Sequence, residues 1–185
     1  QAVSKGYIVP VSSGIGTLDF QTGVESDESE EGHEHEAGDP HVWMNPNNVI
    51  QWVRNMVTVL SKADSGNAAI YREHGEIYIA ELIEMDRYIR DQIRTIPSDK
   101  RILILDHQLF NYFADEYGFT IIGALIPGTS DSAEPSPKAI AGLVDLVREY
   151  KVPALFVGRT ASEGLQKIAE TVIAEAGTVV VILPT

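Results

Sequence analysis

The sequence predicts an α/β fold, in which remnants of a first α/β lobe and a long strut helix precede a lobe built on a parallel sheet. Three observations lead to this prediction. Over residues 98–185, apolar runs alternate with helical patterns in the order β-α-β-α-β-α-β, with mostly short connections, which favours right-handed crossovers between parallel strands. A longer amphipathic pattern comes before them. The apolar content of 44% can fill a core, and no apolar run reaches the roughly 20 residues of a membrane-spanning helix.

Residues 1–45 are predicted to be the end of the first lobe. They contain short β-like pieces at 7–11 and 16–20, which Gly, Ser and Pro interrupt. Residues 25–38 are rich in acids and contain two histidines, but they hold no large apolar side chain. Because such a segment has nothing to anchor it to a core, we expect a mobile acidic loop there.

Residues 46–97 are predicted to form a helix followed by a long linking helix. Asn45 suits the N-cap and Pro46 the first helical position. The first helix, to about Ser61, has apolar residues at spacings of four, three and four: Val49, Val53, Met56 and Leu60. The second, from about 67 to 95, has a predicted buried stripe: Tyr78, Leu82, Met85, Ile89, Ile93 and Ile96. At roughly 40 Å, this second helix is long enough to be a strut between two bodies.

Residues 98–185 are predicted to form the second α/β lobe. Its expected strands are short, strongly apolar runs at 101–105, 119–125, 154–158 and 178–183. The expected helices lie between them at 108–117, 137–150 and 162–176. The run at 101–105 is predicted to be a buried strand.

Composition excludes several classes of protein. The chain has no cysteine, so disulfides, thiolate nucleophiles and cysteine-based zinc sites are absent. The formal net charge is −13. Eight acids lie within residues 25–39, which carry no Lys or Arg: Glu25, Asp27, Glu28, Glu30, Glu31, Glu34, Glu36 and Asp39. Without a basic stripe, nucleic-acid binding is disfavoured, whereas a negative field permits the attraction of metal cations.

Three of the five histidines give little evidence of a site. His74 lies among polar residues within the long predicted helix, and we interpret it as a solvated side chain of the helix face. His33 and His35 lie in the acidic loop, where two interpretations stay open. The loop is either a solvated segment or an auxiliary metal-collecting segment, since imidazole and carboxylate are both zinc ligands.

The other two histidines are the candidate metal ligands. His107 follows the apolar strand predicted at 101–105, and ligands of open parallel sheets bind just beyond the carboxyl ends of the strands. The alternative interpretation is that Asp106 caps the following helix and that His107 is only adjacent to this cap. His41 lies between the acidic loop and the first helix, and nothing in its local sequence alone makes it a ligand.

Four motifs, in order, resemble a known family. Asp-Pro-His-Val-Trp at 39–43, followed by Asn-Pro and a helix, resembles a hallmark of the zinc/manganese-binding substrate-binding proteins of ABC importers. The preceding GHEHEAG resembles the family's histidine-rich acidic loop. DHQLFNYFADEYGF at 106–119 is similar to its second-lobe ligand segment, Thr/Asn-His-Asp-x-Phe-x-Tyr-Phe. IPGTSDSAEPSPKAI at 126–140 is similar to the loop and helix that follow. The resemblance spans residues 31–185.

The resemblance implies two α/β lobes joined by a rigid helix, with a metal ion held between them for delivery to an ABC transporter permease. His41 would be a first-lobe ligand and His107 a second-lobe ligand. Histidine at position 107 favours zinc, because manganese members tend to have glutamate there and manganese prefers oxygen ligands. A manganese-specific protein is the alternative. The resemblance also implies no catalysis, a periplasmic or cell-surface location, and contact with a membrane only through a lipid anchor upstream of this chain.

The sequence departs from the family at three places. The family's first histidine ligand precedes the acidic loop, and an Asp or Glu ligand follows the last strand; this chain supplies neither. We therefore expect it to be a fragment whose remaining ligands lie outside it. Gly158 and Arg159 stand where the family usually has Glu. Since a tight zinc site needs about four donors, we expect the chain alone to bind metal poorly.

Two other classes of function are alternatives to metal binding for transport. A metal-dependent hydrolase needs a general base beside a zinc-bound water, and Asp106 is the only candidate near His107. No nucleophile elbow, phosphate-binding glycine loop or His-Glu-x-x-His motif is present. A structural or adhesive module of the same fold, without a metal site, is the third class.

Overall fold

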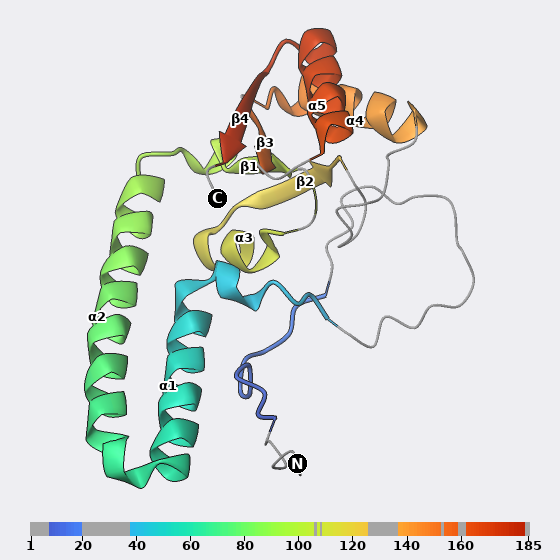
Figure 1. The fold of residues 1–185 in the computed structure, drawn as a ribbon. Helices are drawn as coiled ribbons and strands as arrows, with labels where there is room; N and C mark the ends of the chain where they lie inside the picture. Colours follow the sequence, from blue (N-terminus) through green and yellow to red (C-terminus); the bar gives the residue numbers. More distant parts are fainter. Residues whose placement is uncertain are drawn as a thin grey trace, which may run out of the picture. The chain divides into compact units, whose positions relative to one another are not determined.

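The computed structural model describes residues 8–19, 38–105, 107, 109–125, 137–152, 154–158 and 162–183 (Figure 1). The chain divides into two compact units, one formed by residues 1–17 and 42–93 and the other by residues 18–41 and 94–185. None of the described helices is both long and apolar enough to span a membrane. The acidic segment, with His33 and His35, lies outside the described residues.

The first unit contains a pair of helices, α1 (Pro46–Ala63) and α2 (Ala68–Ile93). Both predicted helices are confirmed to within two residues at either end. Asn45 caps α1, because its side-chain oxygen accepts a 2.9 Å hydrogen bond from the backbone N–H of Asn47. Short 3-10 turns lie at Val42–Met44 and Ser65–Asn67, before and after α1.

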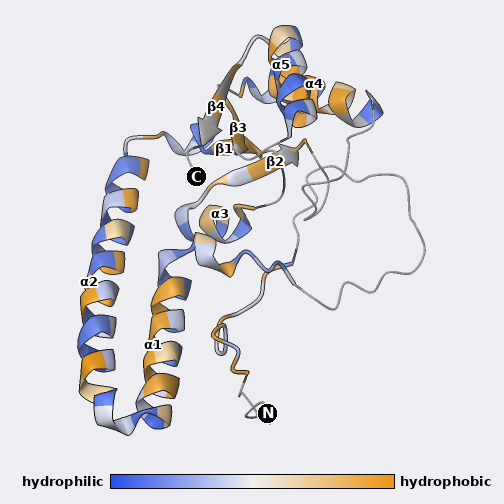
Figure 2. Ribbon diagram, in the orientation of Figure 1, coloured by the Kyte–Doolittle hydropathy of each residue, from blue (hydrophilic) through white to orange (hydrophobic). Residues whose placement is uncertain are grey.

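The buried faces of the two helices agree only in part with the predicted stripes, of which Val53, Leu82 and Ile93 are buried. The core between α1 and α2 consists of Ile50, Val53 and Leu82, with the partly buried Val49, Val57 and Ile79. Four residues of the predicted stripes are instead between 39% and 47% exposed in this chain: Met56, Leu60, Tyr78 and Met85. Each helix carries apolar residues on more than one side (Figure 2), so spacing alone does not determine which side packs against the partner.

Gly75 determines where the two helices meet. It is buried on α2, and a Cβ added there would lie 2.5 Å from Cγ2 of Val57 on α1. The helices therefore approach each other closely at Gly75. A glycine is not among the large apolar residues from which the buried stripe was predicted. This contact places α2 with the side containing Gly75 and Leu82 towards α1.

The β-like pieces predicted at 7–11 and 16–20 are wrong within the described residues 8–19, which contain no strand. Carbonyl groups of both pieces have other partners: Pro10 accepts from the N–H of Ser13 (3.4 Å) and Leu18 from the N–H of Asp39 (2.7 Å). The side-chain amide of Asn55 on α1 also donates to the carbonyls of Val11 (2.7 Å) and Ser13 (2.9 Å). These bonds occupy groups that a sheet would need.

The second unit confirms the predicted parallel α/β lobe. Its strands are β1 (Ile102–Leu105), β2 (Thr120–Ala124), β3 (Ala154–Gly158) and β4 (Val179–Leu183). They pair in the order β2-β1-β3-β4, and every pair is parallel. The helices are α3 (Asn111–Tyr117), α4 (Pro137–Tyr150) and α5 (Glu163–Ala176), and a 3-10 turn, Ser98–Lys100, precedes β1. Helix α3 begins three residues later than predicted, because the N–H of Leu109 first closes a turn on the carbonyl of His107 (2.8 Å).

The sheet separates two hydrophobic cores. Successive side chains of a strand point to opposite faces. Ile104, with Leu155 and Val157, packs into the larger core with α4 and α5, whereas Leu103 and Leu105 pack into a smaller core with Ala114 of α3. Both faces of β1 are thus buried, as its apolar sequence predicted. Two left-handed glycines, Gly118 (φ 70°) and Gly177 (φ 74°), end α3 and α5 and turn the chain into the next strand.

Replacing Gly75 by alanine is expected to lower the free energy of unfolding by about 1–2 kcal/mol. The new methyl group clashes with Val57, and overpacking of this kind costs more than the gain in helix propensity returns. A β-branched side chain in a helix has little rotamer freedom to move aside. Chemical denaturation of the full-length protein measures the change.

Gly142 provides the matched control, because it lies in α4 with no heavy atom within 4 Å of an added Cβ. Gly142→Ala is expected to stabilise the protein by roughly 0.5–1 kcal/mol through helix propensity alone. The loss of free energy of unfolding caused by Gly75→Ala should be smaller in a Val57→Ala background, since the clashing atom is then absent. Equal effects of the two glycine substitutions would contradict the close helix contact.

Candidate metal centre

The position of His107 follows from the topology of the sheet. The chain passes from β1 to β2 on one side and then returns to β3 on the other, so a switch point lies between the carboxyl ends of β1 and β3. Ligand sites of open α/β sheets form at such points. His107 lies two residues beyond the end of β1, and is partly buried. Its position at the strand end, predicted from the sequence, is therefore confirmed.

His41 and His107 lie together within the second unit. Their ring centroids are 5.9 Å apart, and the ring planes are inclined at 62°. His41 is only 8% exposed. Two histidines that are far apart in the sequence thus present their rings to one another.

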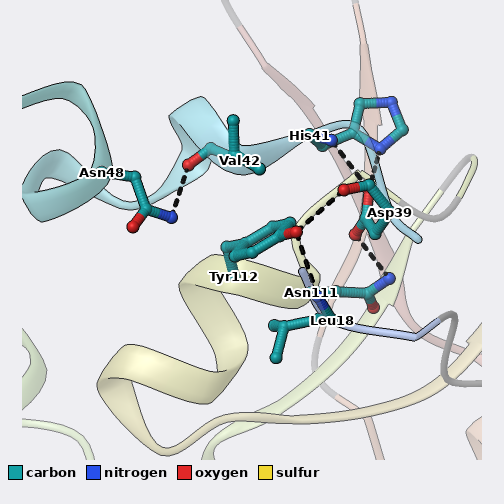
Figure 3. A network of polar contacts seen from close by, with 7 residues as sticks. All are labelled: Leu18, Asp39, His41, Val42, Asn48, Asn111 and Tyr112. Carbon is teal, nitrogen blue, oxygen red and sulfur yellow. Dashed lines mark hydrogen bonds and ion pairs between the residues drawn. The ribbon is translucent and has the colours of Figure 1, made fainter. Parts of the chain in front are cut away.

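Asp39 orients the ring of His41. Its Oδ1 accepts a 2.8 Å hydrogen bond from the backbone N–H of His41 and lies 2.7 Å from His41 Nδ1 (Figure 3). A carboxylate accepts hydrogen bonds but cannot donate them, so Nδ1 carries the proton of this contact. In the neutral ring, the lone pair is then on Nε2, as it is in histidines whose second nitrogen is free for a ligand.

Asp39 is itself held in place by three further hydrogen bonds, and a fourth bond holds one of its partners. Its Oδ2 accepts from the side-chain amide of Asn111 at 2.9 Å, and its backbone carbonyl accepts from the hydroxyl of Tyr112 at 2.8 Å (Figure 3). The N–H of Leu18 donates to the same hydroxyl at 3.1 Å, and the N–H of Asp39 donates to the carbonyl of Leu18 at 2.7 Å. The segment that carries His41 is therefore joined both to the residues before it and to α3.

The hydroxyl of Tyr112 is suited to this role as a donor. Burial raises the pKa of the Tyr112 phenol above its ordinary value, the bond from Leu18 opposes the rise, and the charge of Asp39 adds to it. The phenol therefore stays protonated throughout the physiological range, and its bond to the carbonyl of Asp39 persists.

The other candidate residues are not part of this cluster as far as the structure describes them. His74 is exposed on α2, as predicted. His33, His35, Asp106 and Arg159 lie outside the described residues. Within the described ranges, no group of three or more His, Asp or Glu side chains is arranged to hold a metal ion. The two predicted ligands therefore form only a pair.

Three residues of the cluster were missed from the sequence: Asp39, Asn111 and Tyr112. For Asp39 a signal was present, since an Asp two residues before its partner is the spacing of an Asx-turn. Asn111 and Tyr112 gave no such signal. Their role depends on a contact between segments more than 70 residues apart in the chain.

The comparison with protein families identifies the chain. The family model described as the periplasmic zinc-uptake complex component A, ZnuA, matches residues 2–185. This chain belongs to the ZnuA family. The resemblance inferred from the sequence motifs is confirmed. The family is one of metal-binding proteins of transport systems, which are not enzymes.

Curated relatives in the ZnuA family include both zinc- and manganese-binding proteins. The high-affinity zinc uptake system protein ZnuA of Bacillus subtilis is 31% identical over 194 residues, which cover all of this chain and 57% of that protein. The zinc-binding protein AdcA of Streptococcus pyogenes is 37% identical over 150 residues (80% and 27%). The manganese-binding lipoprotein MntA of Halalkalibacterium halodurans is 33% identical over 130 residues (70% and 43%).

Solved structures with similar folds agree with the predicted class. A crystal structure of ZnuA matches with a TM-score of 0.74 and 25% identity, covering 94% of this chain and 60% of that one. A mutant of the laminin-binding adhesin Lmb of Streptococcus agalactiae matches with a TM-score of 0.77 and 19% identity, covering 95% and 60%. The predicted α/β class is confirmed. This chain spans about half the length of the curated relatives, or less, and about 60% of the solved chains.

Replacing Tyr112 by phenylalanine is expected to lower the free energy of unfolding by about 1–3 kcal/mol, because the buried carbonyl of Asp39 and the partly buried N–H of Leu18 lose their partner. Denaturant titration of the full-length protein measures this. Tyr88→Phe is the matched control, since Tyr88 is 65% exposed and the same chemical change there should cost almost nothing. Similar losses in both variants would contradict the structural role of the Tyr112 hydroxyl.

Proposed function

We propose that this chain is part of an extracytoplasmic binding protein that captures a transition-metal ion, zinc in preference to manganese, and delivers it to an ABC transporter permease. The observation that carries the proposal is the pair of His41 and His107 at the switch point of the sheet, with Asp39 on Nδ1 of His41. Membership of the ZnuA family and the names of the relatives support the same function and a periplasmic or cell-surface location.

The ring separation supports a shared ion. With Zn–N bonds of 2.0–2.1 Å and tetrahedral geometry, two coordinating imidazoles have ring centroids about 5 Å apart. The 5.9 Å between His41 and His107 is close to this value, so a small movement of either ring suffices. We assign Nε2 of His41 as the coordinating atom, since Asp39 occupies the other nitrogen. The remaining donors are proposed to lie outside this chain.

The charge of the cluster also suits a divalent cation. Two neutral imidazoles beside one carboxylate carry a net negative charge, which attracts a cation into a partly buried site. The carboxylate of Asp39 already accepts three hydrogen bonds. It is therefore poorly placed to act as the general base of a hydrolase, and we propose binding without catalysis.

We further propose the domain organisation that the family resemblance implies. Residues 1–45 include the end of a first lobe, residues 46–97 contain the linking helix, and residues 98–185 form the second lobe. The continuous helix α2, Ala68–Ile93, and the complete parallel sheet that follows it support this division.

Alanine at position 41 or 107 is expected to weaken zinc binding by more than about 100-fold. Loss of a ligand should exceed the 10–100-fold effect that is typical when an outer partner of a ligand is lost. A competition titration against a chelator of known zinc affinity, with the full-length protein, measures this. His74→Ala, on the exposed face of α2, is the matched control and should bind as the wild type does. Unchanged zinc affinity in the double variant His41→Ala, His107→Ala would refute the site.

Zinc is expected to bind more tightly than manganese, because nitrogen ligands favour zinc in the order of stability of divalent ions. His107→Glu replaces a nitrogen donor by oxygen and should narrow this preference. Calorimetric titration of both proteins with each ion measures the ratio of dissociation constants. Tighter binding of manganese by the wild type would favour the alternative, a manganese-specific protein like MntA.

A further inference from the structure

We propose that Asn111 is a positioning residue of this metal site. Acting through Asp39, it fixes the orientation of the His41 ring and the spacing between His41 and His107. This role rests on the proposed function and deepens it, because it names a residue that controls the site without touching the ion.

A continuous chain of hydrogen bonds connects Asn111 to the ring. The side-chain amide donates to Oδ2 of Asp39 at 2.9 Å, and Oδ1 of the same carboxylate accepts from Nδ1 of His41 at 2.7 Å (Figure 3). The two oxygens of one carboxylate thus have separate tasks. One faces the ligand ring and the other faces α3, so rotation of the carboxylate breaks both contacts together.

The place of Asn111 in the chain extends its effect to the second histidine. Asn111 is the first residue of α3, and His107 lies four residues before it, in the segment between β1 and α3. The backbone bond from Leu109 to His107 makes this segment a compact turn. The same short piece of chain therefore carries one ring and the donor that holds the carboxylate of the other. Asn111 in this way ties the His41 segment to the His107 segment.

The two halves of the Asn111 amide are used unequally. The residue is fully buried, and its amide oxygen has no hydrogen-bond partner among the groups that the structure describes. A buried unpaired acceptor costs free energy, whereas an apolar side chain of similar volume would remove that cost. The useful half of the amide is the NH₂ group, since a carboxylate can only accept. Its function is to aim Asp39.

Tyr112 does not duplicate this function. Its hydroxyl holds the backbone carbonyl of Asp39 and not the carboxylate. With Asn111 replaced, the main chain at residue 39 stays in place, while the carboxylate loses one of its three hydrogen bonds, the one that Oδ2 accepts. The expected result is a His41 ring that samples both neutral tautomers and several orientations.

The decisive variants are Asn111→Leu, which keeps the volume, and Asn111→Ala, which is smaller and covers the case that leucine does not fit. Asn55→Leu is the matched control: its amide also donates at 2.7 and 2.9 Å, but to the carbonyls of Val11 and Ser13 on the other unit. Two quantities are measured on the full-length protein. They are zinc affinity by chelator competition and, without metal, the nitrogen NMR signals of His41, which report the tautomer.

Both Asn111 variants are expected to bind zinc about 10-fold more weakly, the effect typical of an outer partner of a ligand, and to show a mixture of the two neutral tautomers of His41 in place of the Nδ1-protonated tautomer alone. Asn55→Leu should change neither. In an Asp39→Asn background, Asn111→Leu should cause no further loss of affinity, because Asn111 acts through Asp39.

Wild-type zinc affinity together with an unchanged His41 tautomer in both Asn111 variants would overturn the proposal. So would weaker binding with an unchanged tautomer, or an equal loss in the Asn55→Leu control. A wild type that binds no zinc would instead refute the proposed function. The tautomer comparison needs no metal, so it still shows whether Asn111 orients His41.

Discussion

The buried carboxylate of Asp39 accepts hydrogen bonds from the backbone and ring of His41 and from the amide of Asn111. A charge removed from water is tolerated only where such donors replace its solvation. Meeting this requirement brings a segment from before the helical pair against the start of α3, and the rest of the candidate site depends on that contact. The orientation of the His41 ring and its distance from His107 follow from it.

The need to provide donors for a buried carboxylate also explains why different residues hold the main chain and the side chain of Asp39. Backbone hydrogen bonds with Leu18 and the hydroxyl of Tyr112 fix the main chain, and Asn111 fixes the carboxylate. His107 is positioned independently, by the end of a strand that is buried on both faces. A loop segment is thus made rigid by polar contacts, while the sheet supplies a rigid base for the second ring. Metal ligands need such fixed second partners, because a mobile ring loses entropy on coordination.

Local patterns in the sequence predicted most elements to within a residue or two, and failed where packing partners decide. The helix at Pro46–Ala63 was predicted from its cap and spacing, and Val53 of its predicted stripe is buried, but Met56 and Leu60 are exposed in this chain. Gly75 packs against Val53 and Val57, and a glycine contributes nothing to an apolar pattern. The pieces near Val11 were predicted as strands from their local pattern alone. That prediction failed because a local pattern cannot reveal whether a neighbouring strand exists to pair with.

The sequence by itself determined the α/β class, the order of the elements, the family and the two candidate histidines. These follow from local rules: apolar runs, caps, glycine stops and short motifs, each readable within a few neighbouring residues. Only the tertiary structure decided that His41 lies beside His107 and that Asn111 connects Asp39 to α3. Such contacts join residues more than 60 positions apart, and they form because a buried carboxylate must find donors wherever the folded chain brings them.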